Sequence, residues 1–468
     1  MRATAASHVF TLLVIAATAV PFAAQGRPDG TTPLHEAVYA DDVEAVTRLI
    51  AAGADVKAAN RYGVTPLWLA SLNGSAAAIE LLLKAGADAN TVLPGGETVL
   101  MTAARTGNVD AVNALLRRGA DVNAKEGWRG QTALMWAAAE GHAPVIEALV
   151  ARGADVHGRS NGGFTAILFA AREGQIAAVK ALVAAGARLD DSIPASTPID
   201  EPAPEETGPA PTEAGLNVFL LAVANAHFEL AAWLLDRGAD PNAAPRGWTA
   251  LHQISWVRKM GIAGSNDPAP PGSGNMTSLE LVRKLVAKGA DVNARATKRP
   301  QMGLTTLNAI GATPFLLAAR TADFELMRLL AELGADPKLP NEDNTTPLMV
   351  AAGVGTQNPG EDPGTEPEVL EAVKVALELG NDLNAVDNNG ETVMHGAALK
   401  HVPSVVRYLA ERGARMDVWN RPNKRGWTPL KIAEGVQRGM NIISSPVTAA
   451  TIREVMDNAT RGSAPTSR

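Results

Sequence analysis

The stretch TPLHEAV at residues 32–38 places a histidine beside a glutamate directly after a Thr-Pro pair, and such side chains could serve a metal-dependent hydrolase. The zinc sites of that class need a second histidine four residues after the first, because both ligands must lie on one face of a helix. The fourth residue after His35 is Tyr39. The sequence therefore excludes this zinc site, and the motif needs a structural explanation.

Related heptads recur along the chain at a nearly constant spacing. They begin at residues 32, 65, 98, 132 and 165, in steps of 33, 33, 34 and 33 residues. A fixed period of this length is the signature of a stacked array of short structural units. Later units are predicted to begin at Asn217, Thr249, Thr313, Thr346, Thr392 and Thr428.

Each unit is predicted to contain two helices. The threonine hydroxyl that starts the first helix can cap free backbone amides, and proline at the next position loses no hydrogen bond. The second helix has apolar residues at spacings of three and four, as in Val43, Val46 and Ile50, and ends where glycine can adopt the left-handed conformation. The helix-ending glycines are Gly53, Gly86, Gly119, Gly153, Gly238, Gly289 and Gly334.

These motifs resemble the ankyrin repeat family. The pair TPLH and GADV, and the unit TALMWAAAEGHAPVIEALVARGADV at 132–156, carry the resemblance, which covers nearly all of residues 31–460. It implies an all-α solenoid of about eleven helix-turn-helix units with β-turn or hairpin fingers, serving as a binding surface. It also implies that His35, His252 and His395, at the family's TPLH position, form hydrogen bonds within the finger and the helix start.

The composition of the chain excludes several classes of function. Its 468 residues are 46% hydrophobic but only 4% aromatic, which predicts a large core of small side chains. The absence of cysteine excludes disulfides and thiolate metal sites. A net charge of −7 argues against nucleic acid as a partner. No HExxH, GxSxG or P-loop pattern is present, so we expect no enzymatic activity, no metal and no cofactor.

Residues 1–26 are predicted to form an export signal. Arg2 precedes an apolar run from Val9 to Val20, and small residues follow around Ala24. We therefore expect a periplasmic or secreted protein without a stable membrane span after signal cleavage, the alternative being a membrane anchor if the signal is uncleaved. The alanine-rich, cysteine-free composition favours a bacterial source.

Departures from the period define the predicted domain organisation. Following the signal, we predict repeats 1–5 at 27–189, an acidic Pro-rich insertion at 190–215, repeats 6–11 at 216–460 with insertions at 258–277, 294–312 and 353–364, and a disordered tail at 461–468. The segment at 190–215 could be a hinge, although a continuous stack with a looped-out excursion is favoured. Capping boxes at Thr277 and Thr365 are predicted to restart the helices after two of the insertions.

Ankyrin repeat proteins usually bind their partners with the fingers and with exposed positions of the first helices. Tryptophan and arginine dominate interface energetics, and the motif Arg-Gly-Trp-Thr occurs at both 246–249 and 425–428. The residues between Lys400 and Arg438 are also rich in Lys and Arg. The alternative is that the finger tryptophans only shield neighbouring backbone. The candidate partner-binding residues are Trp128, Trp136, Phe169, Arg172, Arg246, Trp248, Trp256, Arg295, Lys298, Arg299, Arg425 and Trp427.

The sequence thus predicts a non-enzymatic protein interaction scaffold. Its partner is expected to be an unidentified protein, and the chain itself is expected to be a monomer. The alternative is a glycan or small-molecule binding module of the cell envelope, because indole rings stack on sugars. This alternative is weaker because solenoid surfaces of this kind seldom enclose the concave, apolar pockets that small ligands need.

Overall fold

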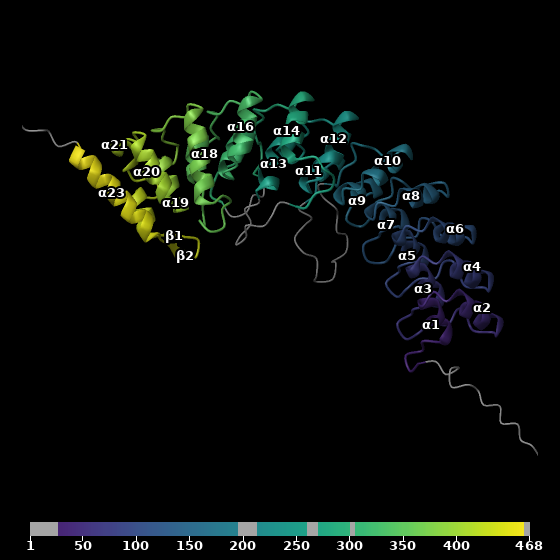
Figure 1. Ribbon diagram of the computed structural model, residues 1–468. Coiled ribbons are helices and arrows are strands. Elements are labelled where there is room, and N and C mark those ends of the chain that lie inside the picture. Colours follow the sequence, from purple (N-terminus) through teal and green to yellow (C-terminus); the bar gives the residue numbers. More distant parts are fainter. Residues whose placement is uncertain (1–26, 195–212, 260–269, 300–304, 463–468) are drawn as a thin grey trace, which may run out of the picture. The chain divides into compact units, whose positions relative to one another are not determined.

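The structure, a computed structural model, describes residues 27–194, 213–259, 270–299 and 305–462 (Figure 1). The predicted export signal, the central parts of the insertions at 190–215, 258–277 and 294–312, and the last six residues lie outside the described residues. The chain divides into two compact units. The first comprises residues 1–128 and 151–154, and the second comprises residues 129–150 and 155–468.

Both units are built from pairs of short helices. The first helices of the pairs are α1 (Pro33–Tyr39), α3 (Pro66–Asn73), α5 (Val99–Thr106), α7 (Ala133–Ala139), α9 (Ala166–Arg172), α11 (Val218–Ala224), α13 (Ala250–Arg258), α15 (Pro314–Arg320), α17 (Pro347–Ala352), α19 (Val393–Lys400) and α22 (Pro429–Glu434). The second helices are α2 (Val43–Ala51), α4 (Ala76–Lys84), α6 (Val109–Arg117), α8 (Ala143–Val150), α10 (Ile176–Ala184), α12 (Phe228–Asp236), α14 (Ser278–Ala287), α16 (Phe324–Glu332), α18 (Glu366–Glu378), α20 (Pro403–Glu411) and α23 (Pro446–Gly462). The described residues therefore contain eleven helix pairs, and the predicted all-α solenoid fold is confirmed.

Three further elements lie in the last units. Helix α21 (Met416–Trp419) is a short turn between α20 and α22. Strands β1 (Val436–Arg438) and β2 (Asn441–Ile443) form an antiparallel hairpin between α22 and α23. The sequence did not predict this hairpin, because three-residue strands give too short a pattern to recognise.

The first helices begin at the predicted capping residues. In the third repeat, the Thr98 hydroxyl accepts a hydrogen bond from the Met101 amide at 3.2 Å. In the sixth repeat, the Asn217 side chain accepts one from the Leu220 amide at 2.8 Å. The helix-ending glycines are also confirmed, with φ between 83° and 101°. Local backbone chemistry therefore sets both ends of each unit.

The TPLH histidines link each unit to the next finger. Their Nδ1 atoms accept the backbone N–H of the capping threonine at 3.2 Å. Their Nε2 atoms lie 3.0–3.1 Å from the carbonyl oxygen that directly precedes the next capping threonine. The structural role predicted for these histidines is confirmed at His35, His252 and His395.

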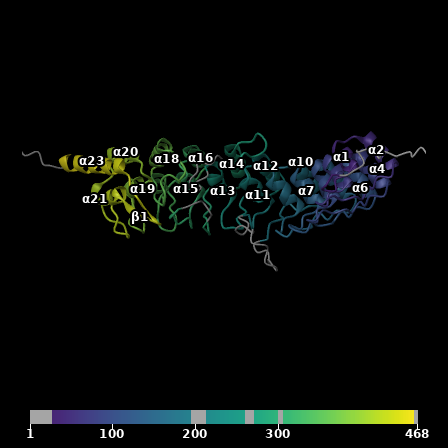
Figure 2. The same cartoon turned by 90° about the horizontal axis from the view of Figure 1, so that it is seen from below.

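The helices of the second unit form two rows. Figure 2 shows α7, α11, α13, α15 and α19 in one row and α10, α12, α14, α16, α18 and α20 in the other. Successive first helices pack against each other, and α9 packs against α11 although 190–215 separates them in sequence. An isolated bridge joins Ser192 to Asn217 at the base of that segment. These contacts join the helices on either side of residues 190–215.

The fingers that precede the first helices share a local design. A side-chain oxygen of Asn60, Asn341, Asp387 or Asn423 accepts backbone N–H groups two and four residues later at 2.8–3.0 Å. Neighbouring fingers are joined by backbone hydrogen bonds, such as that from Lys424 N–H to the Asn389 carbonyl at 2.8 Å. The fingers therefore form a regular surface with a fixed local geometry.

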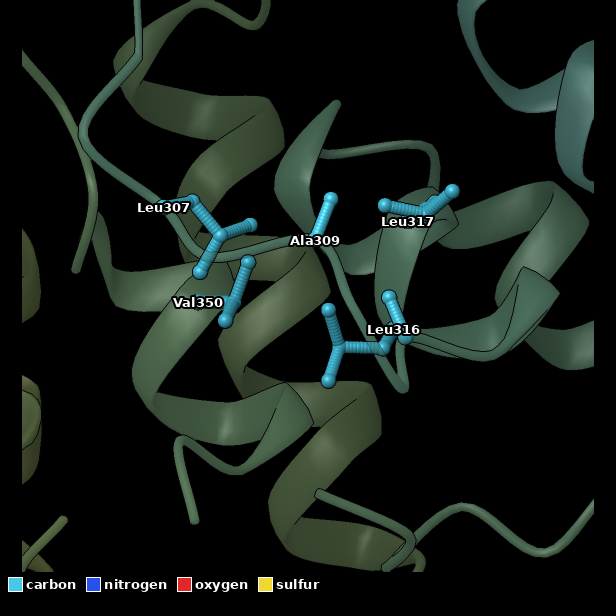
Figure 3. Close-up of a cluster of buried hydrophobic side chains, with 6 residues drawn as sticks. Leu307, Ala309, Leu316, Leu317 and Val350 are labelled. Atoms are coloured by element: carbon cyan, nitrogen blue, oxygen red, sulfur yellow. The ribbon is translucent and has the colours of Figure 1, made fainter. Parts of the chain in front are cut away.

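Two insertions that are far apart in sequence meet in the second unit. Thr305 forms an isolated bridge with Thr356, and the Thr306 N–H donates to the Gly355 carbonyl at 2.9 Å. Leu307 and Ala309, from the predicted finger insertion at 294–312, are buried with residues of α15 and α17 (Figure 3). This end of the insertion is therefore part of the core and does not project as a free finger.

Candidate functional site

Two of the predicted binding residues are buried. Phe169 is 6% exposed and Trp248 is 7% exposed, so the expectation that these rings form part of an open surface was wrong. The Phe169 ring packs 5.1 Å from Phe164, and Trp248 packs edge-on against Trp256 at 6.0 Å. The physical reason is that the surrounding core is built from small side chains, and a large ring gains most by filling it.

The four candidate arginines between residues 172 and 299 contact aromatic rings and backbone carbonyls of the protein itself. Arg172 lies 5.2 Å from the centre of the Phe169 ring, and Arg246 lies 4.9 Å from that of Trp248. Arg295 donates to the carbonyls of Gly311 and Pro340, and Arg299 donates to the Thr305 carbonyl. These contacts favour a role in ordering the fingers.

The remaining candidates are more accessible. Trp128 is 66% exposed and lies in the first unit. Trp136 and Trp256 are half-buried, and Trp256 packs against the core cluster around Leu307. Lys298 is exposed. Within the second unit, Trp136, Trp256 and Lys298 do not line the cavities at which Arg425 and Trp427 lie.

Arg425 and Trp427 lie at two adjoining cavities formed by the fingers of the last units. The larger, of about 240 Å³, is polar and includes Asn308, Asp343, Asp387, Glu391, Lys424 and Arg425 in its lining. The smaller, of about 80 Å³, shares Thr306, Glu391 and Arg425 with the first and reaches Trp427 and Arg438. We call the larger cavity the finger hollow and the smaller one the Arg438 cavity.

Hydrogen bonds within the fingers hold the hollow's carboxylates. Asp387 accepts the Thr345 hydroxyl at 2.9 Å, and Glu391 accepts the Asn423 amide at 3.1 Å. Burial raises the pKa of Glu391, and the neighbouring Asp387 raises it further, whereas Asn423 and Arg425 oppose the shift. Burial also raises the pKa of Asp387. The hollow therefore combines partly desolvated acids with the two cations of the last finger.

The Arg425 guanidinium lies 5.1 Å from the centre of the Trp427 ring. Asn423 fixes the backbone of both residues by accepting their N–H groups at 3.0 Å. Arg425 is exposed and Trp427 is half-buried. The pair thus presents a planar cation and an aromatic surface side by side at the rim of the hollow.

Arg438, which the sequence did not single out, is 6% exposed and lines the smaller cavity from the end of β1. Its Nη1 donates to the Leu399 carbonyl at 2.7 Å, and its Nη2 lies 3.5 Å from His401 Nε2. Burial lowers the pKa of Arg438 to about 10. The excess of basic residues between 400 and 438 was the available signal, but only the hairpin turns this arginine inward.

A buried charged cluster lies next to the Arg438 cavity. Asp362, from the insertion at 353–364, lies between Arg320 at 3.4 Å and Lys400 at 3.8 Å. All three side chains are at most 5% exposed. The Thr356 hydroxyl, which lines the cavity, donates to Asp362. Burial lowers the pKa of Lys400, and Asp362 opposes that shift. This cluster anchors the insertion to α15 and α19.

Two general features of the described residues bear on other functions. Within the ranges given above, the structure has no group of three or more His, Asp or Glu side chains arranged to hold a metal ion. Across the same ranges, no helix is both long enough and apolar enough to span a bilayer.

Comparisons with known families give consistent matches. Residues 1–93, 34–126, 100–193 and 366–441 match a family model described as ankyrin repeats in three copies. Residues 219–254 match a second model, described as ankyrin repeats in many copies. The matches to the first model together cover more than half of the chain.

Individual relatives align with parts of the chain. Human protein fem-1 homolog A is 32% identical over 108 residues, which are 22% of this chain and 16% of that protein. Human ankyrin repeat and SOCS box protein 16 is 30% identical over 251 residues, which are 47% of this chain and 48% of that protein. The chain thus spans less than half the length of either relative. The crystal structure of the human ASB11 ankyrin repeat domain is 24% identical with a TM-score of 0.43, and the match covers 56% of this chain and 99% of that one.

Proposed function

Because the chain belongs to the ankyrin repeat family, whose repeats generally mediate protein-protein interaction, we propose that it is a non-enzymatic scaffold that binds a protein partner. The partner docks on the fingers around the finger hollow of the second unit. Arg425 and Trp427 are the proposed anchors. We further propose that the chain is monomeric and acts after export to the periplasm or to the medium, which rests on the export signal predicted at residues 1–26.

The observation that carries this proposal is the Arg425–Trp427 pair at the rim of a polar hollow. Arginine and tryptophan in a recessed, partly desolvated setting are the residue types that contribute most to protein interfaces. The nearby hairpin adds exposed apolar surface, since Met440 is 98% exposed and Ile442 is 78% exposed. Exposed large apolar side chains grouped beside a polar rim are typical of interaction surfaces.

The cavity dimensions favour a protein partner over a glycan or another small molecule. Pockets for small molecules usually measure about 300–1,000 Å³ and are lined mainly by apolar groups. The finger hollow measures about 240 Å³, and carboxylates, amides and cations line much of it. Such a recess suits a few side chains of a larger partner.

Affinity copurification of the tagged protein from envelope and culture-medium fractions tests the proposal. The test variant is Arg425→Ala with Trp427→Ala. The matched control is Arg412→Ala with Tyr408→Ala. Arg412 likewise lies 4.8 Å from the centre of the Tyr408 ring, but this pair lies at the C-terminal end of the second helix α20. A protein captured by the wild type and by the control, but lost with the test variant, supports the proposed surface. Capture that persists in the test variant contradicts it.

A further inference from the structure

We propose that the Arg438 cavity is a carboxylate-binding subsite that accepts one carboxylate group of the partner protein. The group could be an Asp or Glu side chain or the carboxyl terminus of the partner, which present the same chemistry. That the ligand belongs to a partner protein rests on the proposed function. That the ligand is a carboxylate rests on the geometry around Arg438.

One edge of the Arg438 guanidinium has unused donor capacity. Its Nη1 is held by the Leu399 carbonyl, with a longer contact of 3.5 Å to the Gln357 carbonyl. Its Nε is buried and has no hydrogen-bond partner, and its Nη2 makes only the 3.5 Å contact with His401. Nε and Nη2 together form the edge that binds a carboxylate with two parallel hydrogen bonds. The side chain is thus held in place from one side, while the Nε–Nη2 edge has no oxygen acceptor among the described contacts.

Two other arginines of the same unit, the partly buried Arg258 and the buried Arg320, show what is missing. Arg258 contacts Asp323 at 2.6 Å, and Arg320 contacts Asp362 at 3.4 Å. Around Arg438 the described residues supply only carbonyl oxygens and a histidine nitrogen as direct partners. A buried cation without an anion is costly, and a ligand carboxylate would remove that cost.

Glu391 lines the same cavity but is engaged elsewhere. Its carboxylate accepts the Asn423 amide at 3.1 Å, and the charges that act on its pKa are those of Asp387 and Arg425. It forms no ion pair with Arg438 among the described contacts. Glu391 therefore leaves Arg438 to a ligand, and its position disfavours a ligand that carries more than one negative charge.

The size and surroundings of the cavity fit a single carboxylate. A volume of about 80 Å³ exceeds the ~15 Å³ that one water needs, so it can hold a carboxylate with its methylene stem. The cavity shares Thr306, Glu391 and Arg425 with the finger hollow, which provides the route of entry. Trp427 also lines it and can pack on the stem of the entering side chain. The hairpin turn at Gly439 and the insertion residue Gln357 complete the wall.

The test uses the purified full chain labelled with ¹⁵N-arginine and three short peptides. Acetyl-Gly-Glu-Gly-amide offers only a side-chain carboxylate, acetyl-Gly-Gly-Gly offers only a terminal carboxylate, and acetyl-Gly-Gly-Gly-amide is the uncharged control. The Nε–H resonance of Arg438 is assigned by its loss in Arg438→Lys. We expect one of the two acidic peptides to shift this resonance saturably at constant ionic strength, and the amide control to leave it unchanged.

Peptide binding to the variants is measured by the rise in melting temperature with peptide concentration. We expect Arg438→Lys to weaken binding at least tenfold, because an ammonium group cannot form the two parallel hydrogen bonds. The matched control Arg412→Lys alters an exposed arginine outside both cavities and should bind as the wild type does. Should Arg438→Lys fail to fold, the wild-type melting temperature decides: it should rise with one of the acidic peptides and stay unchanged with the amide control.

The outcomes separate this inference from the proposed function. A shift by either acidic peptide supports the subsite and identifies the side chain or the terminus as its ligand. No shift by either peptide, an equal shift by the amide control, or tighter binding of inorganic phosphate would overturn it. A partner that is captured equally well by Arg438→Lys leaves the scaffold standing and removes the subsite. If the acidic peptides bind but no protein is captured, the subsite stands and the proposed scaffold function is contradicted.

Discussion

The regular repeats of residues 27–128 and the interrupted repeats of residues 305–443 use the same helix pair in different ways. In the described part of the first region, the buried polar side chains are histidine, serine and threonine that serve caps and helix contacts. The Arg117–Glu80 ion pair there has both side chains more than half exposed. In the second region, Arg320, Asp362 and Lys400 are buried together.

The difference follows from the insertions. A regular repeat is covered by an identical neighbour, so apolar and small side chains suffice to fill the contact. The segment at 305–312 precedes α15, and the segment at 353–364 separates α17 from α18. Both add backbone that brings carbonyls and charges in need of partners. The finger hollow, the Arg438 cavity and the buried cluster all lie where these segments meet. Departure from the period therefore marks the region proposed to bind the partner.

The largest expected effect comes from Asp362→Asn. This change removes the carboxylate that Arg320 and Lys400 both contact, and breaking a buried ion pair in this way costs about 3–5 kcal/mol. Urea unfolding combined with hydrogen exchange of α17–α19 should show the loss. Adding Lys400→Met should recover part of it, because the buried ammonium group that Asp362 stabilised is then also removed. If Asp362→Asn left the free energy of unfolding unchanged, water would have to reach this cluster.

Trp248→Ala and Trp427→Ala should separate packing from binding. Trp248 is 7% exposed and contacts Trp256, so its removal leaves a cavity and should cost about 3 kcal/mol. Trp427→Ala should change the free energy of unfolding by less than about 1 kcal/mol, because a half-buried ring leaves a much smaller cavity. Urea midpoints of the two variants provide the comparison, and equal losses would argue that Trp427 is a packing residue.

Acid should weaken the second unit through its TPLH histidines. Burial lowers the pKa of both His252 and His395 from 6.5 to about 4, so the folded state binds fewer protons than the unfolded chain between these values. Stability is then complete above pH 6.5 and falls as the pH approaches 4. At pH 5 each histidine should cost about 2 kcal/mol relative to pH 7. Urea midpoints of His252→Gln with His395→Gln should depend less on pH, and an unchanged slope would refute this origin.

The last comparison concerns the loss of stability at two glycines with opposite surroundings. Gly153 has φ = 87° and open space where a Cβ would lie, so Gly153→Val should cost about 1–2 kcal/mol through backbone strain alone. Gly396 in α19 has no such φ, but a Cβ there would lie 2.7 Å from the Val354 nitrogen of the insertion. Gly396→Ala should therefore destabilise by steric overlap, by about 1–3 kcal/mol. Thermal melts test both, and a tolerated Gly396→Ala would show that the insertion can move away from α19.

The sequence by itself determined the repeating architecture. Caps such as Thr98, closing glycines such as Gly153 and linking histidines such as His395 each act over a short stretch of chain or from one unit to the next. Their geometry is therefore set by local backbone rules and by the period, both of which can be recognised in a single sequence. The chemical identity of the proposed anchor pair, Arg425 and Trp427, was visible for the same reason.

Only the tertiary structure decided which side chains are buried and which surround a common space. Thr305 and Thr356 pair across 51 positions, and Arg438 meets Gln357 across 81, although no sequence pattern links these segments. Burial of Trp248 depends on Trp256 in the following helix and could not be inferred from the finger motif it shares with Trp427. Contacts of this kind arise from the packing of insertions against one another, because burial and electrostatic environment are properties of the assembled fold and not of the local sequence.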